Sequence, residues 1–214
     1  MREALSPLVD LIYPPRCPLC GDAIAAQDGL CSGCWSGLDV PDIEEDGVVA
    51  ATLYNDAARR LVLSFKHGKR IGLAPMMARM MAAQVQARIG AMGADWTLVP
   101  VPLHPVRLWQ RGFNQSALIA RQMAKPLGAR LLVDGLKRTR RTPSLGGLGR
   151  AERAAVLTGA IAVNPARRSR LEGASVLLVD DVLTSGATSR ACMAALRDAG
   201  AVRVTLACFS RVAG

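Results

Sequence analysis

One stretch near the carboxyl end constrains this chain more than any other. Residues 176–179 form a continuous run of β-branched residues and leucine, which predicts a buried strand of a parallel sheet. Two adjacent carboxylates, Asp180 and Asp181, follow at the carboxyl end of this strand, where open α/β sheets bind ligands. After a short loop, the alanine-rich residues 187–199 predict a helix. The stretch therefore predicts a strand, an acidic pair, a loop and a helix, in that order.

The loop between this strand and helix consists of small and hydroxylated residues, which are Thr184, Ser185, Gly186, Ala187 and Thr188. Such a loop can offer several backbone N–H groups and a helix N-terminus to one anion. The neighbouring carboxylates suit sugar hydroxyls or a hydrated Mg²⁺. The pattern predicts a pocket for a phosphorylated sugar, and the alternative is a plain strand–helix turn whose aspartates cap the helix. No Gly-Lys-Ser/Thr ends the loop, which excludes a Walker nucleotide loop.

Two Cys-x-x-Cys pairs lie near the amino terminus, and their members are Cys17, Cys20, Cys31 and Cys34. Each pair can present two thiolates on one side, so the four form a tetrahedral sulfur set that suits structural Zn²⁺. A segment this short has little core, so we expect metal binding to supply its folding energy. A redox pair or disulfides are the alternatives, which a reducing cytoplasm and a doubled motif disfavour.

The length of 214 residues suits one mid-sized domain and a small module. The acidic residues 42–46 predict a linker, so we expect a cysteine module at residues 1–46 and a larger domain at residues 47–214. Cys192 and Cys208 then fall in the last helix and strand, where we expect packed thiols. No run is long enough to span a membrane, and the first residues lack the apolar core of a signal peptide. These features predict a cytoplasmic protein without membrane insertion.

The chain is strongly basic, with 27 Lys and Arg against 17 Asp and Glu and a net charge of +10. This charge predicts anionic partners: phosphates, nucleic acid or an acidic membrane surface. Residues 137–170 contain nine basic residues and one acidic residue, Glu152. They form either a track for phosphates and single-stranded DNA or an ordinary solvated face.

A second candidate segment follows the strand predicted at residues 97–102. We expect a loop there whose Arg107 and Arg111 reach a pyrophosphate and neutralise its charge as it leaves. Trp109 and Phe113 alternate with these arginines and can stack on a base. The alternative is a surface loop whose aromatic side chains pack inward. We also expect helices at residues 56–65, 73–89 and 114–125, and strands at residues 160–163 and 202–209 that complete the sheet.

Residues 176–188 resemble the 5-phosphoribosyl-1-pyrophosphate (PRPP) motif of type I phosphoribosyltransferases. Three further stretches narrow the resemblance: Phe-Lys-His-Gly at residues 65–68, Val-Pro-Val-Pro-Leu-His at residues 99–104 and Arg-Gly-Phe-Asn-Gln at residues 111–115. With the paired Cys-x-x-Cys motifs, they resemble the ComF family over nearly the whole chain. Leu145 and Val156 stand where that family usually carries Gln and Asn.

The resemblance implies an α/β fold with a mainly parallel sheet and flanking helices, preceded by a zinc-ribbon-like module. It implies that the residues 184–188 hold the 5′-phosphate of PRPP and that Asp180 and Asp181 hold the ribose hydroxyls, with Mg²⁺. Arg111, Arg107 and Lys66 would then stabilise the departing pyrophosphate during phosphoribosyl transfer.

The family is associated with DNA uptake in natural transformation, which implies partners in the competence machinery. The competing hypothesis is a non-catalytic protein that keeps the PRPP pocket as a nucleotide sensor and binds single-stranded DNA. The sequence identifies neither a general base nor an acceptor.

Overall fold

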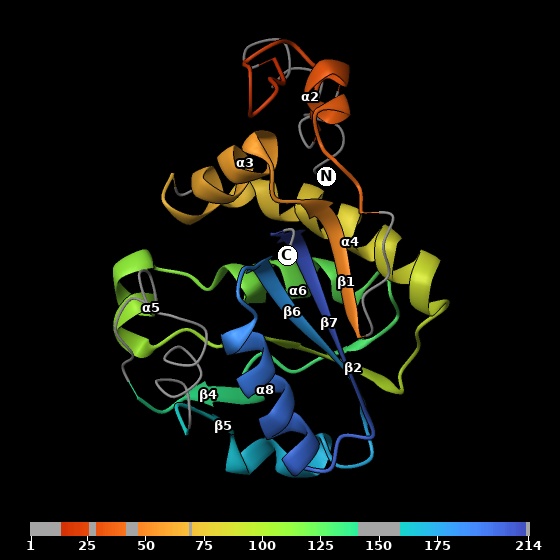
Figure 1. The fold of residues 1–214 in the computed structure, drawn as a ribbon, viewed down its shortest axis with the longest axis vertical. Coiled ribbons are helices and arrows are strands. Elements are labelled where there is room, and N and C mark those ends of the chain that lie inside the picture. Colours follow the sequence, from red (N-terminus) through yellow and green to blue (C-terminus); the bar gives the residue numbers. More distant parts are fainter. Residues whose placement is uncertain (1–13, 26–28, 42–46, 69, 141–158, 213–214) are drawn as a thin grey trace, which may run out of the picture.

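A five-stranded sheet forms the centre of the computed structural model, which describes residues 14–25, 29–41, 47–68, 70–140 and 159–212 (Figure 1). The strand order is β1-β7-β6-β2-β3, and every neighbouring pair is parallel. The strands are β1 (Val48–Leu53), β7 (Arg203–Arg211), β6 (Ser175–Leu183), β2 (Trp96–Pro100) and β3 (Arg130–Leu131). The predicted parallel α/β sheet is confirmed.

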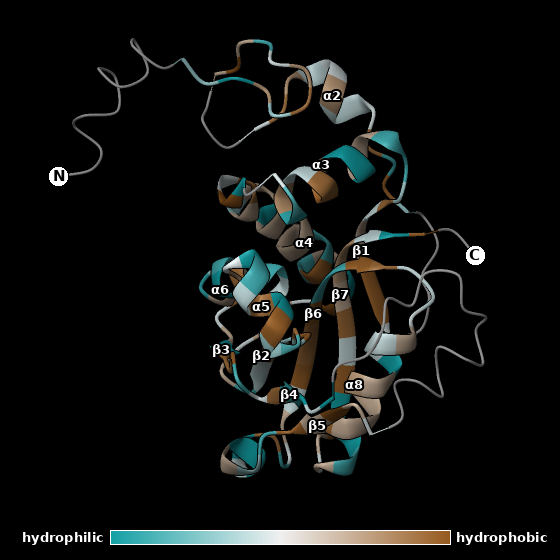
Figure 2. Cartoon of the chain, turned by 90° about the vertical axis from the view of Figure 1, so that its left-hand side faces the viewer, coloured by the Kyte–Doolittle hydropathy of each residue, from teal (hydrophilic) through white to brown (hydrophobic). Residues whose placement is uncertain are grey.

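The central strands are apolar on both faces, as a sheet covered on both sides requires. Residues 176–179 of β6 are fully buried, and Val179 lies opposite Ala207 of β7 and Pro100 of β2. Figure 2 shows the brown, hydrophobic strands between helices of mixed polarity.

Helices cover both faces of the sheet. The amphipathic α3 (Asp56–Lys66), α4 (Ala74–Ile89) and α6 (Gln115–Ala124) share one core with Leu98, Leu177 and Phe209. On the other face, α8 (Ala187–Asp198) packs Cys192 against Leu178 and Leu206. Cys192 and Cys208 are both fully buried, so the prediction of packed core thiols is confirmed.

The chain leaves neighbouring strands β2 and β6 in opposite directions. From β2 it passes through α6 to the edge strand β3, whereas from β6 it passes through α8, on the other face, to β7. Such a reversal opens a crevice outside the carboxyl ends of the two strands, where open α/β sheets bind ligands. Asp180 and Asp181 lie near the end of β6 at this crevice.

Two sequence expectations are wrong. Residues 160–163 do not join the main sheet, because β5 (Ile161–Val163) pairs antiparallel with β4 (Leu136–Arg138) in a separate two-stranded sheet. The segment after β2 is not a loop but the helix α5 (Pro105–Arg111). Pro105 favours the first position of a helix, and the His104 side chain caps it by accepting the Val106 N–H (3.2 Å). The three predicted helices agree with α3, α4 and α6 within one residue at each end.

The cysteine module lies beyond α3 from the sheet (Figure 1). It contains the short helix α2 (Ser32–Ser36) and an isolated bridge between Arg16 and Ala23. Two 3₁₀ turns, η1 (Ile71–Leu73) and η2 (Pro165–Arg170), complete the elements of the described residues. Among the described helices, none combines the length and the hydropathy that a bilayer crossing requires.

Candidate sugar-phosphate site and metal centre

The two aspartates at the end of β6 have different partners. Asp181 is buried, and its Oδ1 lies 3.1 Å from Nζ of Lys66, the last residue of α3. Oδ1 of Asp180 accepts hydrogen bonds from Ser116 Oγ (3.1 Å) and from the Asp181 N–H (2.9 Å). Helices α3 and α6 therefore each hold one member of the pair in place.

The proximity of the two carboxylates affects their protonation. Burial raises the pKa of Asp180, and the negative charge of Asp181 raises it further, to about 7. Lys66 and the hydrogen bonds from the Asp181 N–H and Ser116 act in the opposite direction. Asp180 is therefore close to half-protonated near neutral pH, and a bound cation or a hydroxyl donor would favour its ionised form.

The expected phosphate loop occupies the turn between β6 and α8. Gly186 is the N-cap of α8 with φ +71°, a left-handed conformation that favours glycine. Glycine has no side chain that could cap the helix, and none of the described residues is recorded as capping it instead. The first N–H groups of α8 therefore have no capping side chain, which suits an anion.

The arginines expected to contact a pyrophosphate lie on or beside α5. Arg111 donates from Nη1 to Oε1 of Gln115 (3.2 Å), and Gln115 is 2% exposed. Nε2 of Gln115 has no hydrogen-bond partner among the described residues. Burial lowers the pKa of Arg138 on β4, and the positive charge of nearby Arg107 lowers it further. The charge of Arg107 on α5 thus acts on Arg138 of β4, so these two elements bring positive charge to one region.

The two aromatic residues of this segment behave differently. Trp109 on α5 is 85% exposed, whereas Phe113 is half-buried and its ring centroid lies 5.9 Å from that of Phe65. Phe113 therefore packs inward, as the alternative of inward-packed aromatic side chains predicted. Within this segment, Trp109 is the aromatic side chain that remains open to a base.

Two of the basic residues 137–170 have partners in the part that the structure describes. Arg167 pairs with Asp134 (3.0 Å), and Arg168 donates to the Asp198 carbonyl (3.0 Å). Residues 141–158, with Leu145 and Val156, lie outside the described residues.

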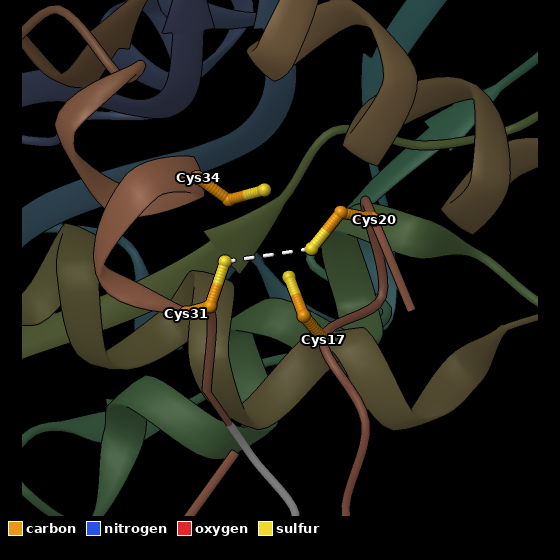
Figure 3. Close-up of side chains that lie close together, drawn as sticks. All are labelled: Cys17, Cys20, Cys31 and Cys34. Atoms are coloured by element: carbon orange, nitrogen blue, oxygen red, sulfur yellow. Dashed lines mark hydrogen bonds between the residues drawn. The ribbon is translucent and has the colours of Figure 1, made fainter. Parts of the chain in front are cut away.

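The four cysteines of the amino-terminal module converge on one point (Figure 3). Their Sγ atoms all lie within 4.8 Å of one another, and those of Cys20 and Cys31 are 3.4 Å apart. Four thiolates bound to one zinc at about 2.3 Å would lie about 3.8 Å apart, so the donor set fits tetrahedral Zn²⁺. All four are free cysteines, which favours zinc over the disulfide alternative.

Backbone groups favour a thiolate at Cys17 but not at its pair member. Burial raises the pKa of Cys17, but the N–H groups of Cys31, Cys20 and Leu19 lower it to about 6. A hydrogen bond from the Asp22 backbone lowers the pKa of Cys20, but burial and the neighbouring Cys31 thiol raise it overall. The turn is closed by hydrogen bonds from the Cys17 N–H to the Asp22 carbonyl (2.7 Å) and from the Gly21 N–H to the Cys17 carbonyl (2.9 Å).

The cysteine module contacts the helix that carries Lys66. Arg70, just after α3, donates to the Pro18 carbonyl inside the first Cys-x-x-Cys pair (3.0 Å). Asn55, the N-cap of α3, donates to the Gly37 carbonyl (2.8 Å) and to Asp39 Oδ2 (2.8 Å). A cavity of about 180 Å³ lies at this contact, lined by Arg16, Pro18, Gly29, Arg70, Gly72, Leu73 and Met76.

The sequence analysis placed the acidic pair, Lys66 and Arg111 in one region. The structure joins Lys66 and Ser116 to the acidic pair, whereas Arg111 contacts Gln115, the residue before Ser116. The sequence analysis missed Ser116, Gln115 and Arg138 as individual residues. Ser116 and Gln115 directly follow Asn114 of the Arg-Gly-Phe-Asn-Gln stretch, which was their signal. Arg138 had no signal beyond its place in a basic run.

Two domain families match the chain. Residues 8–46 match the double zinc ribbon domain, and residues 114–213 match the phosphoribosyl transferase domain. Lys66, Arg107 and Arg111 lie between these two matches. The first match and the sulfur cluster together support structural zinc.

Relatives align with most of the chain. Competence protein F of Haemophilus influenzae is 27% identical over 188 residues, which cover 87% of this chain and 80% of that protein. DNA utilization protein YhgH of Salmonella typhimurium is 29% identical over 197 residues, which cover 91% of this chain and 83% of that protein.

A solved structure of glutamine PRPP amidotransferase from B. subtilis, complexed with ADP and GMP, matches more distantly. It is 24% identical, with a TM-score of 0.40, over 62% of this chain and 25% of that chain, and it adds nothing to the fold described above. The domain matches and the relatives confirm the resemblance to the ComF family, with a double zinc ribbon followed by a phosphoribosyltransferase domain.

Proposed function

We propose that this protein binds PRPP, or a closely related phosphorylated ribose, with Mg²⁺ at the carboxyl ends of β2 and β6. One observation carries the proposal: two neighbouring carboxylates, held by α3 and α6, precede by a few residues a helix whose N-cap is a glycine without a capping side chain. A phosphorylated ribose has hydroxyls that the carboxylates can bind and a phosphate that the helix N-terminus can bind. The match to the phosphoribosyl transferase domain over residues 114–213 supports the same ligand class.

Each part of the site has a role in this proposal. Residues 184–188 bind the 5′-phosphate through backbone N–H groups and hydroxyls, while Asp180 and Asp181 accept hydrogen bonds from the ribose hydroxyls. The two aspartates are oxygen donors that would suit Mg²⁺, which when bound would neutralise charge on the ligand. Lys66 lies 3.1 Å from Asp181, and this ion pair holds the Asp181 carboxylate in place.

We propose phosphoribosyl transfer as the reaction. The bond between the anomeric carbon and pyrophosphate breaks, the electron pair leaves with pyrophosphate, and a lone pair of the acceptor forms the new bond to carbon. The carbon passes through an oxocarbenium-like state, so stabilising the leaving group matters more than a strong base. Arg111, Arg107 and Lys66 would supply this stabilisation, and Gln115 positions the guanidinium of Arg111 (3.2 Å).

The biological setting that we propose is DNA uptake in the cytoplasm, with competence-machinery proteins as partners. The names of the two relatives, a competence protein and a DNA utilization protein, support it. A second candidate function follows from Trp109, whose 85% exposure beside Arg107 suits stacking on a base of single-stranded DNA. In that case the sugar-phosphate pocket would serve as a sensor without catalysis.

Titration calorimetry of the zinc-loaded protein with PRPP and Mg²⁺ tests the proposal, beside a double variant, Asp180→Asn/Asp181→Asn. We expect binding by the wild type and a loss of binding by the folded double variant. Absence of PRPP binding by the folded wild type would refute the proposal. Release of pyrophosphate in the presence of a candidate acceptor would then separate an enzyme from a sensor.

A single-stranded oligonucleotide, titrated at two salt concentrations, tests the second function. Affinity that falls with salt and falls again in Trp109→Ala would support it. An oligonucleotide affinity that Trp109→Ala leaves unchanged would exclude Trp109 as a stacking platform.

A further inference from the structure

Arg190 lies in α8 beside the loop to which we assign the phosphate. Its backbone N–H donates to the Gly186 carbonyl (2.8 Å), which places it one turn into the helix. A Cβ on Gly186 would come within 2.7 Å of Nη1 of Arg190 and 3.5 Å of its Cζ. The guanidinium therefore lies over the loop, in space that the glycine leaves open, while the Arg190 side chain as a whole stays exposed to solvent.

This position is electrostatically unfavourable for a lone cation. The N-terminus of a helix carries partial positive charge, which disfavours Lys and Arg there and favours anions. The first turn of α8 contains no acidic residue, and in the part of the chain that the structure describes no carboxylate forms an ion pair with Arg190. Arg197, in the last turn of the same helix, has the favourable placement. Helix dipole, uncapped N–H groups and guanidinium thus add up to a positive field at Gly186.

We propose that Arg190 is a binding residue for the phosphate monoester of the sugar ligand. This inference rests on the proposed function and adds a residue to the same site. A guanidinium can donate two parallel hydrogen bonds to phosphate oxygens, which a lone ammonium cannot. Arg190 would therefore select a ligand with a doubly charged phosphate over a neutral sugar, whereas Arg111 and Arg107 act at the pyrophosphate end.

Two ligands probe the two ends of the site separately. Ribose 5-phosphate reports on the phosphate end, and pyrophosphate with Mg²⁺ reports on the other end. Titration calorimetry would compare wild-type protein with Arg190→Ala, Arg190→Lys and Arg197→Ala. The last variant is the matched control, because it removes the same charge from an exposed position at the opposite end of the same helix.

We expect Arg190→Ala to bind ribose 5-phosphate about tenfold more weakly, the effect of losing one charge-assisted hydrogen bond. Its affinity for pyrophosphate should equal that of the wild type, and Arg190→Lys should recover part of the loss. Arg197→Ala should match the wild type with both ligands. The melting temperature of ligand-free Arg190→Ala should not fall, because the substitution removes a cation from an unfavourable position.

The unfavourable outcomes are distinguishable. Equal affinities of Arg190→Ala and Arg197→Ala for ribose 5-phosphate would overturn the role of Arg190 and leave the proposed function intact. An equal loss for both ligands would reveal a general charge effect and also overturn it. A wild type that binds neither ribose 5-phosphate nor PRPP would overturn both proposals.

Discussion

Replacing Asp180 with Asn should change how stability depends on pH. The pKa of Asp180 is about 7 in the folded protein, against roughly 3.9 for an unfolded aspartate. Between these values the folded state holds a proton that the unfolded state releases, so the stability of the wild type falls as pH rises through this window and levels off above pH 7. Asn keeps an acceptor for Ser116 and for the Asp181 N–H without the charge.

The magnitude follows from the width of the window. From pH 5.5 to the pKa near 7, the wild type should lose roughly 1.4 kcal/mol per pH unit, so about 2 kcal/mol in all, relative to Asp180→Asn. Urea unfolding of zinc-loaded protein at pH 5.5 and 8.5, followed by circular dichroism, measures this difference. The pH dependence of zinc binding is common to both proteins and cancels in the comparison.

The control is Asp95→Asn, which removes an exposed carboxylate in the turn before β2. Its stability relative to wild type should be the same at both pH values. If the difference in unfolding free energy between wild type and Asp180→Asn is also the same at both pH values, the account of the buried carboxylate pair is refuted.

Three further predictions concern the supports of the site. Lys66→Met leaves Asp181 buried without its cation. Because Lys66 is partly exposed (23%), the unfolding free energy measured in urea should fall by about 2 kcal/mol. An unchanged unfolding free energy would mean that the ion pair is not formed. Gly186→Ala places a side chain at φ +71° and against Arg190, so the unfolding free energy should fall by about 1–2 kcal/mol and ribose 5-phosphate should bind more weakly. An affinity equal to that of the wild type would exclude a structured phosphate loop. Cys17→Ser should abolish zinc binding, which a colorimetric chelator measures. It should also lower the melting temperature, because the cysteine module supports α3. Full retention of zinc would contradict the four-sulfur site.

Much of the fold was readable from the sequence for simple physical reasons. The apolar run of β6 is typical of a strand buried on both faces of a parallel sheet, and Asn114, the first residue of a predicted helix, caps α6 by accepting the Ala117 N–H (3.4 Å). Residues 105–111 were expected to form a loop, but Pro105 can begin a helix and does so here. The three residues of β5 were assigned to the wrong sheet because strand pairing depends on long-range contacts that a local pattern does not encode.

The candidate site was predicted in its residue types but not in its pairings. The partnership of Lys66 with Asp181 joins residues more than 100 positions apart, and nothing in the local sequence selects Asp181 over Asp180. The contact between Ser116 and Asp180 likewise joins residues that are distant in the sequence, 64 positions apart. The boundary expected between residues 46 and 47 borders residues 42–46, which lie outside the described residues, and it stays a prediction.

A crystal structure of the zinc-loaded protein with ribose 5-phosphate tests the central claim most directly. The account predicts the phosphate at the first turn of α8, on Gly186 and Thr188, and the ribose hydroxyls on Asp180 and Asp181. A ligand bound instead in the cavity between the cysteine module and Arg70, or anywhere away from the ends of β2 and β6, would contradict it.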